Sequence, residues 1–398
     1  MRLAGRHVLL GVSGGIASYK SCTLARRLAE AGARVDVVLT RAAAEFVRPV
    51  IFEALTGRPV LTSLWTAGTA LDHVRLPAAA DLLIVAPASA DLVGRAALGL
   101  ADDLLAAMLL ARTGPLLLAP AMNDAMFAHP ATQANLATLR ARGAHIVGPE
   151  IGPLAEGPSE RPGRMSDPEV ILAHAERLLR GDGRLAGRRV LVTAGATREP
   201  LDPVRVVTNR SSGKMGYRIA EAAWARGAEV TLVAGPGALP EPVGVTVHRV
   251  ETTADLEAAV REALPGADVL VMAAAPADYR PTGAADRKRP RHAGPLQVEL
   301  EPTGDILVGT RPARKPGAVV VGFALETGDA VAKGRAKLAA KALDLVVVND
   351  ALEPGAGFEH DTNRVTLVAS NGAATALPLL DKRAVAEAIL DAVEARLG

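Results

Sequence analysis

Short apolar runs alternate along the whole chain with longer stretches whose apolar residues recur every three or four positions. The short runs predict buried β-strands, and the longer stretches predict helices with one apolar face. Strands that alternate with helices are typical of a doubly wound α/β fold with a mainly parallel sheet. In the first half we expect strands over 7–11, 34–39, 81–86, 116–119 and about 145–148, and helices near 15–31, 42–47, 90–112 and 131–142.

The second half opens as the first half does. RLAGR followed by HVLLGVSGG at residues 2–15 is echoed by RLAGR followed by RVLVTAGAT at residues 184–197. A buried strand that enters a turn of small residues opens a new α/β unit in each half, so we predict a boundary near 181–183 and domains over 1–181 and 187–398. In the second domain we expect strands over 189–194, 229–234, 245–250, 268–273, 318–323 and 344–348, helices near 214–226, 253–263 and 328–342, late strands within 357–370 and a closing helix over 382–397.

One stretch interrupts the alternation. Residues 152–165 read GPLAEGPSERPGRM, and their three prolines and three glycines exclude a regular helix or a central strand. The stretch also carries two carboxylates, a hydroxyl and two guanidinium groups. It is either a passive connector or a lid that brings a proton donor to a site.

Composition narrows the class of protein. The chain has 398 residues, of which 49% are hydrophobic and 22% charged, so it supports large packed cores and is not disordered as a whole. Aromatic residues make up only 3%, which leaves few platforms for stacking nucleic-acid bases. The net charge of +2 and the pI of about 8.8 suit small phosphorylated ligands better than a DNA backbone.

The number of cysteines and the length of the apolar runs indicate the cellular compartment of the protein. Cys22 is the only cysteine, which excludes an intramolecular disulfide and a cysteine-rich metal site. The apolar run at the N-terminus is too short for a signal peptide, and no segment offers about 18 uninterrupted apolar residues. We expect a soluble, cytoplasmic protein that binds neither membranes nor nucleic acid.

The first glycine-rich turn, GVSGGIASYK at residues 11–20, joins a predicted strand to a predicted helix. Backbone N–H groups at such a turn can approach an anion. The turn is not a P-loop, because Tyr19 stands where the second glycine is required, and it is not a GxGxxG dinucleotide motif. Phosphate binding and a plain tight turn both remain open.

Polar residues follow the other predicted strands of this half, at the sheet edge where open α/β sheets bind ligands. Thr40 follows the second strand, Ser89 lies in APASA after the third, and Asn123 lies in PAMNDAMF after the fourth. His73 precedes the third strand, and a lone histidine is more often structural or exposed than catalytic. Asn123 is either a turn former or a ligand-binding residue.

Together these motifs are specific. GVSGGIASYK, a histidine before the APAS strand, GLADDLL, PAMNDAMF and a late GRM resemble the flavin-dependent cysteine decarboxylases. They are most similar to the N-terminal half of the bifunctional phosphopantothenoylcysteine decarboxylase/phosphopantothenate–cysteine ligases of coenzyme A synthesis, although Phe127 stands where that family has tryptophan. The resemblance implies a flavodoxin-like domain that holds FMN through Ser13, Gly14, Gly15, Thr40 and Ser89, with His73 as base, Asn123 on the substrate carboxylate, and Arg164 and Met165 near the substrate.

The 152–165 stretch departs from the family at its proton donor. The family carries Ala-Cys-Gly before Gly-Arg-Met, and this chain has Ala155-Glu156-Gly157. Cys22 lies early in the first helix and does not replace the missing cysteine. Three hypotheses follow: Glu156 donates the proton, the reaction stops at the enethiol, or the decarboxylase is weakened and the ligase dominates.

The second half carries another anion-binding turn, in which TNRSSGKMG at residues 208–216 opens a helix. Together with AAPADYR, GFALET and VND, this turn resembles the CTP-dependent ligase half of the same family, so the resemblance covers nearly the whole chain in the family's order. It implies a Rossmann-like domain that joins 4′-phosphopantothenate to cysteine through an acyl-cytidylate, using CTP with Mg²⁺. The residues it implies are Asn209 and Lys288 in catalysis and Ala275, Asp278, Asp305, Ile306, Phe323, Lys337 and Lys341 in substrate binding; the metal ligands stay unknown.

Two departures affect this half. The family's K-x-K-K element keeps only Lys288, because Pro290 and Arg291 replace the other two lysines. A solvated basic loop is the alternative interpretation of that element. The family's Asn-Pro-Asp-Ile reads Thr303-Gly304-Asp305-Ile306, so only Asp305 and Ile306 carry over.

Two other classes of protein compete with this interpretation. A pyridine-nucleotide dehydrogenase would need a GxGxxG motif, which neither half has. A flavin-binding regulatory protein would not need the ligase residues Asn209, Asp278 and Lys288. The resemblance also implies a homo-oligomer in which neighbouring decarboxylase domains share the flavin site.

Overall fold

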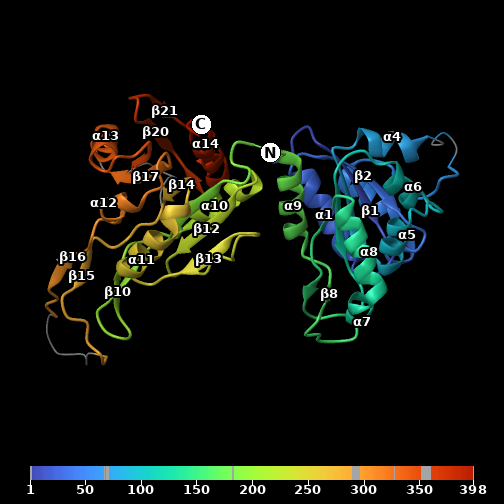
Figure 1. Cartoon of the computed structure of the whole chain (residues 1–398), viewed down its shortest axis with the longest axis horizontal. Coiled ribbons are helices and arrows are strands. Elements are labelled where there is room, and N and C mark those ends of the chain that lie inside the picture. Colours follow the sequence, from blue (N-terminus) through green and yellow to red (C-terminus); the bar gives the residue numbers. More distant parts are fainter. Residues whose placement is uncertain are drawn as a thin grey trace. The chain divides into compact units, whose positions relative to one another are not determined.

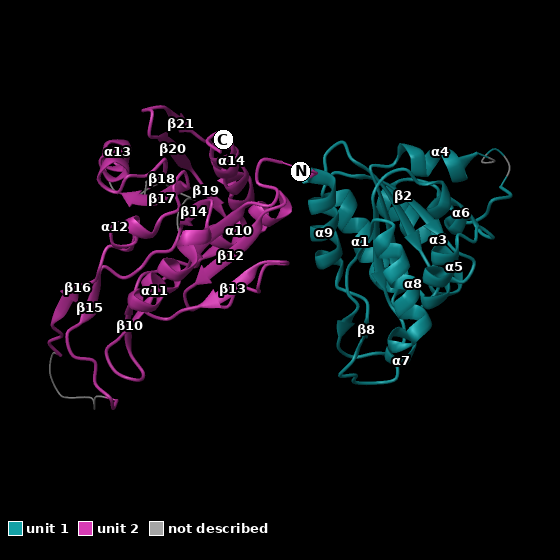
Figure 2. Ribbon diagram, viewed as in Figure 1, with its two compact units in different colours: residues 1–180 teal, residues 181–398 magenta. Residues whose placement is uncertain are grey.

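The computed structural model describes residues 2–66, 68, 71–181, 183–288, 296–326, 328–350 and 360–397. The chain divides into two compact units, residues 1–180 and 181–398, which Figure 2 shows in different colours. Figure 1 labels the helices and strands of both units. Among the described helices none is long and apolar enough to cross a membrane.

The first unit is built on a six-stranded sheet. Its strands are β1 (His7–Val12), β2 (Arg34–Leu39), β3 (Val60–Leu61), β4 (Leu82–Ala88), β5 (Leu116–Pro120) and β6 (Ala144–Ile146). They lie in the order β3-β2-β1-β4-β5-β6, and every neighbouring pair is parallel. Because β1, β4 and β5 are buried along their whole length, both faces of the sheet must be covered.

Helices cover both faces of this sheet. They are α1 (Ser18–Glu30), α2 (Ala43–Phe46), α3 (Pro49–Thr56), α4 (Asp72–Ala79), α5 (Ala90–Leu98), α6 (Leu104–Ala111), α7 (Asp124–Ala128), α8 (Pro130–Ala141) and α9 (Pro168–Arg180). One apolar layer joins α1, α3 and α9 to the sheet, and another joins α5, α6 and α8 to it. The unit therefore has the doubly wound α/β fold that the sequence predicts.

The second unit is built on an eight-stranded sheet in the order β13-β12-β9-β14-β17-β18-β20-β21. Its pairs are parallel from β13 to β18, and β20 and β21 add antiparallel strands at one edge. The strands are β9 (Arg189–Ala194), β12 (Glu229–Ala234), β13 (Thr246–Arg249), β14 (Val269–Met272), β17 (Val319–Glu326), β18 (Leu345–Asp350), β20 (Val365–Ala369) and β21 (Ala374–Ala376). The sheet is thus mainly parallel, as expected.

The helices of this unit are α10 (Lys214–Ala225), α11 (Thr253–Ala263), α12 (Ile306–Gly309), α13 (Ala330–Ala340) and α14 (Lys382–Glu394), with short 3₁₀ turns at Leu264–Gly266 and Arg311–Ala313. Helices α11, α12 and α13 pack on one hydrophobic core. Helices α10 and α14 are joined by Arg226, which donates hydrogen bonds to Glu387 and Asp391.

Short antiparallel pairs lie outside the two main sheets. In the first unit, β7 (Glu150–Ile151) pairs with β8 (Pro162–Arg164). Strand β7 immediately precedes the 152–165 stretch, and β8 lies near its end. In the second unit the pairs are β10 (Arg198–Pro200) with β11 (Val206–Thr208), β15 (Tyr279–Pro281) with β16 (Leu300–Pro302), and β19 (Thr362–Asn363) with β22 (Leu380–Asp381).

The element predictions are wrong at one long helix and incomplete elsewhere. The predicted helix over 90–112 is two helices, because α5 ends at Gly99 in a left-handed conformation (φ +73°) and Asp103 then caps α6. The sequence analysis did not predict α3 or α9. The late strand β20 and the closing helix α14 are confirmed.

Candidate active sites

A cavity of about 1290 Å³ opens in the first unit at the carboxyl ends of β1, β2, β4 and β5. Open α/β sheets bind ligands at this edge, and the volume accommodates a large one. Its lining includes nine of the residues predicted from the sequence, namely Ser13, Gly14, Gly15, Thr40, Ser89, Asn123, Glu156, Arg164 and Met165.

Hydroxyl groups organise the floor of this cavity. The buried Ser13 hydroxyl donates to the Pro87 carbonyl (2.8 Å) and accepts from the Ser89 amide (2.9 Å), which ties the end of β1 to the end of β4. The oxygens of Thr40 and Ser89 accept backbone N–H groups of Ala43 and Leu92 at the starts of α2 and α5. Because the Thr40 and Ser89 oxygens accept these N–H groups, their O–H groups can still donate hydrogen bonds to an anion.

The glycine turn leaves room for a ligand beside these hydroxyls. A Cβ atom on Gly14 would lie 2.5 Å from Cβ of Ala42, so a side chain would clash there. A Cβ atom on Gly15 would meet nothing within 4 Å. Exposed backbone, two hydroxyl donors and adjacent space are what a phosphorylated cofactor needs, so these residues fit one.

The structure brings Asn123 and Glu156 together. Asn123 caps α7 by accepting from the amides of Ala125 and Met126, and this fixes the orientation of its side-chain amide. Its Nδ2 then donates to Oε1 of Glu156 at 3.3 Å. Glu156 is exposed, so this conformation does not provide the burial that the proton-donor hypothesis requires.

An ion network of Lys20, Arg164 and Asp167 also lines this cavity, and the sequence analysis did not name Lys20 or Asp167 as site residues. Lys20 Nζ donates to Asp167 (2.8 Å) and to the carbonyl of Met165 (3.0 Å), while Arg164 donates to the second oxygen of Asp167 (2.6 Å). The hydrogen bond from Lys20, helped by Arg164, holds the pKa of Asp167 below its usual value. The Met165 side chain is only 1% exposed and belongs to the core, so its backbone faces this network.

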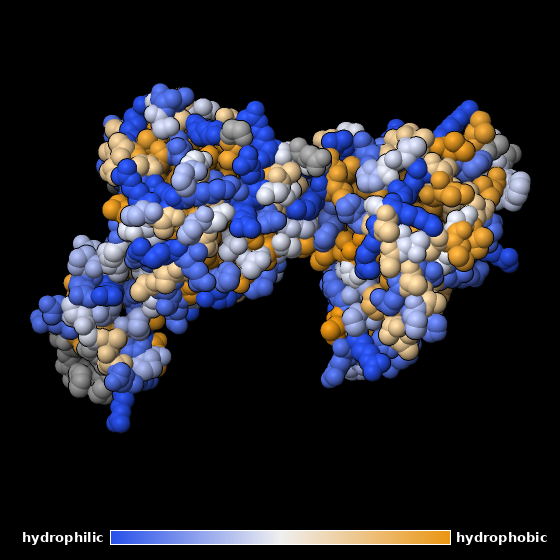
Figure 3. All heavy atoms as spheres, in the orientation of Figure 1, coloured by the Kyte–Doolittle hydropathy of each residue, from blue (hydrophilic) through white to orange (hydrophobic). Residues whose placement is uncertain are grey.

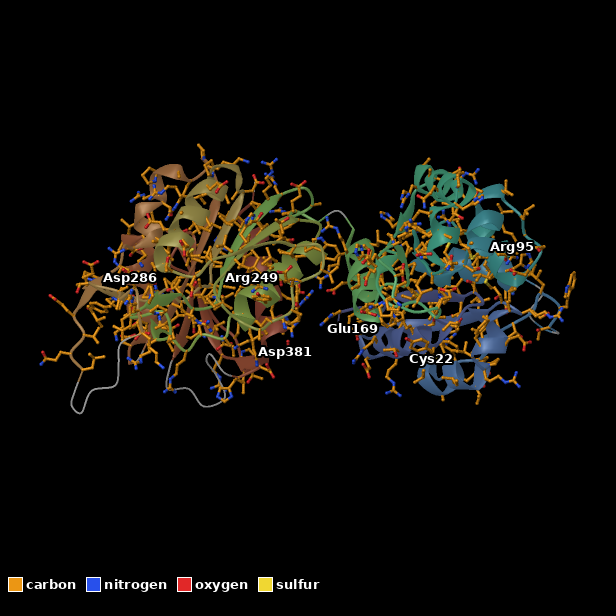
Figure 4. All side chains as sticks on the ribbon, turned by 90° about the horizontal axis from the view of Figure 1, so that it is seen from below. Cys22, Arg95, Glu169, Arg249, Asp286 and Asp381 are labelled. Atoms are coloured by element: carbon orange, nitrogen blue, oxygen red, sulfur yellow. The ribbon has the colours of Figure 1, made fainter. Side chains whose placement is uncertain are left out.

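Arg95, labelled in Figure 4, joins the acidic residues at the rim of the cavity. It donates to Asp91, Asp102 and Asp103. Burial acts to lower the pKa of Arg95, but the hydrogen bonds to Asp103 and Asp102 outweigh it and raise the pKa. Asp102 and Asp103 belong to the GLADDLL motif, whose role the sequence left unassigned, and Asp91 lies in the first turn of α5.

His73 does not share the cavity with the other predicted residues of its unit. It is half-buried on α4, and it is not among the lining residues within the described chain. Exposed apolar side chains lie on or beside α4 and at the ends of α5 and α6, namely Leu71, Val74, Leu98, Leu100 and Leu110. Figure 3 shows hydrophobic residues on the surface of the first unit where Figure 1 places these helices.

The second unit has its own cavity of about 580 Å³, beside the carboxyl ends of β14, β17 and β18 and the start of α10. Eight predicted residues line it: Asn209, Ala275, Asp278, Asp305, Ile306, Phe323, Lys337 and Lys341. Lys288 is exposed and is not part of this lining in the described residues. Its neighbours in the motif, Pro290 and Arg291, lie outside the described residues.

Two of the lining residues of this cavity are lysines, Lys337 and Lys341. Lys341 pairs with Asp305 (2.8 Å), and Lys337 donates to the Phe323 carbonyl (2.6 Å). Burial disfavours the ionised form of Asp305, but the Lys341 hydrogen bond prevails and lowers its pKa. Burial and the nearby Lys341 charge lower the pKa of Lys337. These two cations lie one helical turn apart, as a phosphate clamp requires.

Two further lysines line the cavity: Lys214, which belongs to the predicted anion-binding turn over 208–216, and Lys382, which sequence reasoning missed. Lys214 opens α10 and pairs with Asp361 (2.6 Å). Lys382 opens α14 and is only 5% exposed, and burial together with the Lys214 charge lowers its pKa to about 8. Within the described residues no group of three or more His, Cys, Asp or Glu side chains forms a metal site.

Family comparisons agree with this division into two units. The family described as Flavoprotein matches residues 2–179, and the family described as DNA/pantothenate metabolism flavoprotein C-terminal domain matches residues 185–397. The fold, the two cavities and the two family matches together define the protein as a two-unit flavoprotein of pantothenate metabolism.

Relatives of known name match over the whole chain. The coenzyme A biosynthesis bifunctional protein CoaBC of Mycobacterium bovis is 49% identical over 403 residues, which cover 98% of this chain and 96% of that protein. CoaBC of Bacillus subtilis is 42% identical, over 99% of this chain and 98% of that protein. A crystal structure of the C-terminal domain of a CoaBC protein is 41% identical, covers 54% of this chain and 98% of that chain, and has a TM-score of 0.47. The chain belongs to the CoaBC family of bifunctional coenzyme A biosynthesis enzymes.

Proposed function

We propose that the second unit joins 4′-phosphopantothenate to cysteine with CTP, and that the first unit decarboxylates the product to 4′-phosphopantetheine with FMN. The observation that carries the proposal is the convergence of 17 predicted site residues on two separate cavities, nine in one and eight in the other. Membership of the bifunctional family supports the same division.

In the second unit, a carboxylate does not acylate an amine until it is activated. We expect Lys337 and Lys341 to hold the CTP phosphates, which offsets the charge that builds up as carboxylate meets phosphate. Joining to the α-phosphate releases pyrophosphate, and attack by the cysteine amine releases CMP. Asn209, which donates to the Pro276 carbonyl (2.9 Å), lies where it can orient the acyl-cytidylate. Mg²⁺ enters with the nucleotide, since CTP phosphates supply the hard oxygen ligands it prefers.

In the first unit, Gly14, Gly15, Thr40 and Ser89 would hold the FMN phosphate. When bound, FMN supplies the electron sink that a β-thiol lacks. Asn123 binds the substrate carboxylate through a neutral amide and so orients it without over-stabilising the ground state. Arg164 and the 152–165 stretch cover the bound anion, and the stretch closes to exclude water.

Glu156 is the proposed proton donor of the final step. A substrate carboxylate held by Asn123 would place a second negative charge beside Glu156, because the Asn123 amide and the Glu156 carboxylate are 3.3 Å apart. That charge favours the protonated form of Glu156. Once CO₂ has left, Glu156 would give its proton to the enethiol carbon that carried the carboxylate, while reduced FMN, held by the residues named above, would supply the hydride for the carbon that carries sulfur.

His73 fits this scheme when it comes from a neighbouring chain. It lies outside the cavity lining of its own unit, next to exposed apolar side chains on α4, α5 and α6. A second copy would cover that apolar surface and bring His73 to the neighbour's flavin. We therefore propose that the protein is a homo-oligomer. We also propose that it acts in the cytoplasm on small-molecule substrates.

The test is a two-part assay on the purified chain. The protein should be yellow from bound FMN, and it should release pyrophosphate from CTP only when 4′-phosphopantothenate is present. Colourless protein would refute the flavin half. Pyrophosphate release that does not depend on 4′-phosphopantothenate would refute the proposed ligase function of the second unit.

A further inference from the structure

The segment Ala275–Asp278 forms one wall of the second cavity and is held at its backbone from two sides. On the cavity side, Asn209 Nδ2 donates to the carbonyls of Pro276 (2.9 Å) and Ala275 (3.3 Å). On the opposite side, the Ala277 amide donates to the hydroxyl of Thr197 (2.8 Å). Two residues implicated in substrate binding, Ala275 and Asp278, therefore depend on this backbone for their position.

The contact to Thr197 is the start of a buried chain. Thr197 Oγ1 lies 2.9 Å from Thr253 Oγ1, and Thr253 Oγ1 donates to Oε1 of Glu199 (2.8 Å). The Thr253 amide donates to the same Glu199 oxygen (2.8 Å). Each side chain in this chain is at most 3% exposed, and none of the three lines the cavity among the described residues.

Donor and acceptor roles fix the direction of this chain. The Ala277 N–H can only donate, and Glu199 Oε1 accepts from the amide of Thr253. Thr253 Oγ1 lies closer to Glu199 Oε1 (2.8 Å) than to the Ala277 carbonyl (3.4 Å), so its proton goes to Glu199. The Thr197 proton then goes to Thr253, and the Thr197 oxygen accepts from Ala277. Three hydrogen bonds then point the same way towards one buried carboxylate, and such bonds polarise and strengthen one another.

We propose that Glu199 is a positioning residue of the second site, which acts through Thr253 and Thr197 to fix the Ala277 amide and hence the Ala275–Asp278 wall. This inference rests on the proposed ligase function for its effect on turnover. Its structural part is independent of that function, because the protection of the Ala277 amide follows from the hydrogen bonds alone.

Two substitutions separate positioning from simple support of the fold. Glu199→Gln keeps an oxygen that accepts both Thr253 donors, whereas Glu199→Met has similar size and no acceptor. Thr197→Val removes the acceptor of the Ala277 amide without changing the side-chain volume by much. Glu387→Gln is the matched control, because it weakens the bonds from Arg226 and Arg383 in the same unit without touching this wall.

The experiment measures hydrogen exchange of the peptide over 273–279, CTP-dependent pyrophosphate release and thermal unfolding. We expect Glu199→Met and Thr197→Val to raise exchange of this peptide by at least about tenfold and to lower kcat/KM for CTP by about thirtyfold, while decarboxylation is unchanged. Glu199→Gln and Glu387→Gln should stay within about threefold of the wild type in both readouts.

Wild-type exchange of the 273–279 peptide in both Glu199→Met and Thr197→Val would overturn the proposal. An equal loss of turnover in Glu199→Gln and Glu199→Met would also overturn it, because the hydrogen-bond acceptor that Gln retains would then not contribute to turnover. If Glu199→Met does not fold, Thr197→Val decides alone. A wild type that releases no pyrophosphate from CTP would refute the proposed function, and the exchange comparison would still decide the positioning claim.

Discussion

Glu156 stands where the flavin-dependent cysteine decarboxylases that this chain resembles carry a cysteine. Its carboxylate is exposed and lies 3.3 Å from the Asn123 amide. A free glutamate titrates near 4.3, so it donates a proton at neutral pH only when burial or a neighbouring negative charge favours the acid form. In the proposed function, a closed lid and the substrate carboxylate would together provide those conditions.

We predict that Glu156→Gln still oxidises and decarboxylates phosphopantothenoylcysteine but accumulates the enethiol under anaerobic conditions. Mass spectrometry of the products and the absorbance of the flavin measure this directly. Glu156→Cys should restore turnover with a different pH profile. Normal yields of phosphopantetheine from the Gln variant would show that another group delivers the proton and that Glu156 only belongs to the lid.

Residues that carry motifs could be predicted from the sequence, and residues defined by long-range pairing could not. Gly14, Thr40, Ser89 and Asn123 follow predicted strands, so the sheet edge alone brings them together. Lys20 meets Asp167 across 147 positions, and no local pattern signals such a pair. Lys214 was part of the predicted anion-binding turn, and Lys382 could have been found, because it opens a predicted helix.

At the scale of elements, a buried ion network joins β1 to β2 and to the residues after α3. Asp36 accepts from His7 Nε2 (2.7 Å) and from Arg58 Nε (2.5 Å), and both Asp36 and His7 are nearly inaccessible. Burial disfavours the Asp36 carboxylate, but the hydrogen bonds from His7 and Arg58 outweigh burial and lower its pKa. A lowered folded-state pKa means that protonation of Asp36 weakens the fold.

We predict that Asp36→Asn lowers the free energy of unfolding of the first unit by about 3 kcal/mol at pH 7, because one partner of a buried pair is lost. The stabilisation by Asp36 is present above its unfolded pKa, near 3.9, and is lost as the pH falls through its lower folded pKa. Denaturant titrations between pH 2 and 7 should therefore show the difference between wild type and variant shrinking only below about pH 4.

Glu30→Gln is the control for this pH series. Glu30 pairs with Arg27 on the exposed surface of α1, where solvent screens the ion pair and it contributes little to stability. Its substitution should leave the unfolding midpoint nearly unchanged. An Asp36→Asn effect no larger than that of Glu30→Gln at pH 7 would contradict the account of the network.

Element types followed from the hydrophobic pattern, whereas some boundaries did not. The apolar pattern continues across residues 99–103, so only the left-handed Gly99 and the capping Asp103 divide α5 from α6. In short pairs such as β10–β11 and β15–β16 each strand has only three residues, and alternation over three residues carries little signal. The long parallel strands were predictable because they are buried on both faces.

At the scale of the whole molecule, each unit has its own core and its own cavity. Among the residues predicted for the first site, His73 alone lies outside the lining of that cavity in the described chain. If a neighbouring chain supplies it, two inactive variants can complement each other.

We predict that mixed oligomers of His73→Asn and Asn123→Asp chains regain decarboxylation, although each variant alone is inactive. Random 1:1 mixing would leave about a quarter of the sites with both wild-type residues. A mixture of His73→Asn with the His73→Asn/Asn123→Asp double variant is the control and should stay inactive. Absence of recovery in the first mixture would show that His73 does not act across chains.

The most direct test of the account as a whole is product analysis with 4′-phosphopantothenate, cysteine, CTP and Mg²⁺. Wild-type protein should yield phosphopantetheine, CO₂, CMP and pyrophosphate in equal amounts. Asn123→Asp places a charge against the substrate carboxylate in a poorly screened site, so it should stop at phosphopantothenoylcysteine with CMP and pyrophosphate unchanged. CO₂ release by this variant at the wild-type rate, or wild-type product without CTP consumption, would contradict the assignment of the two activities to the two cavities.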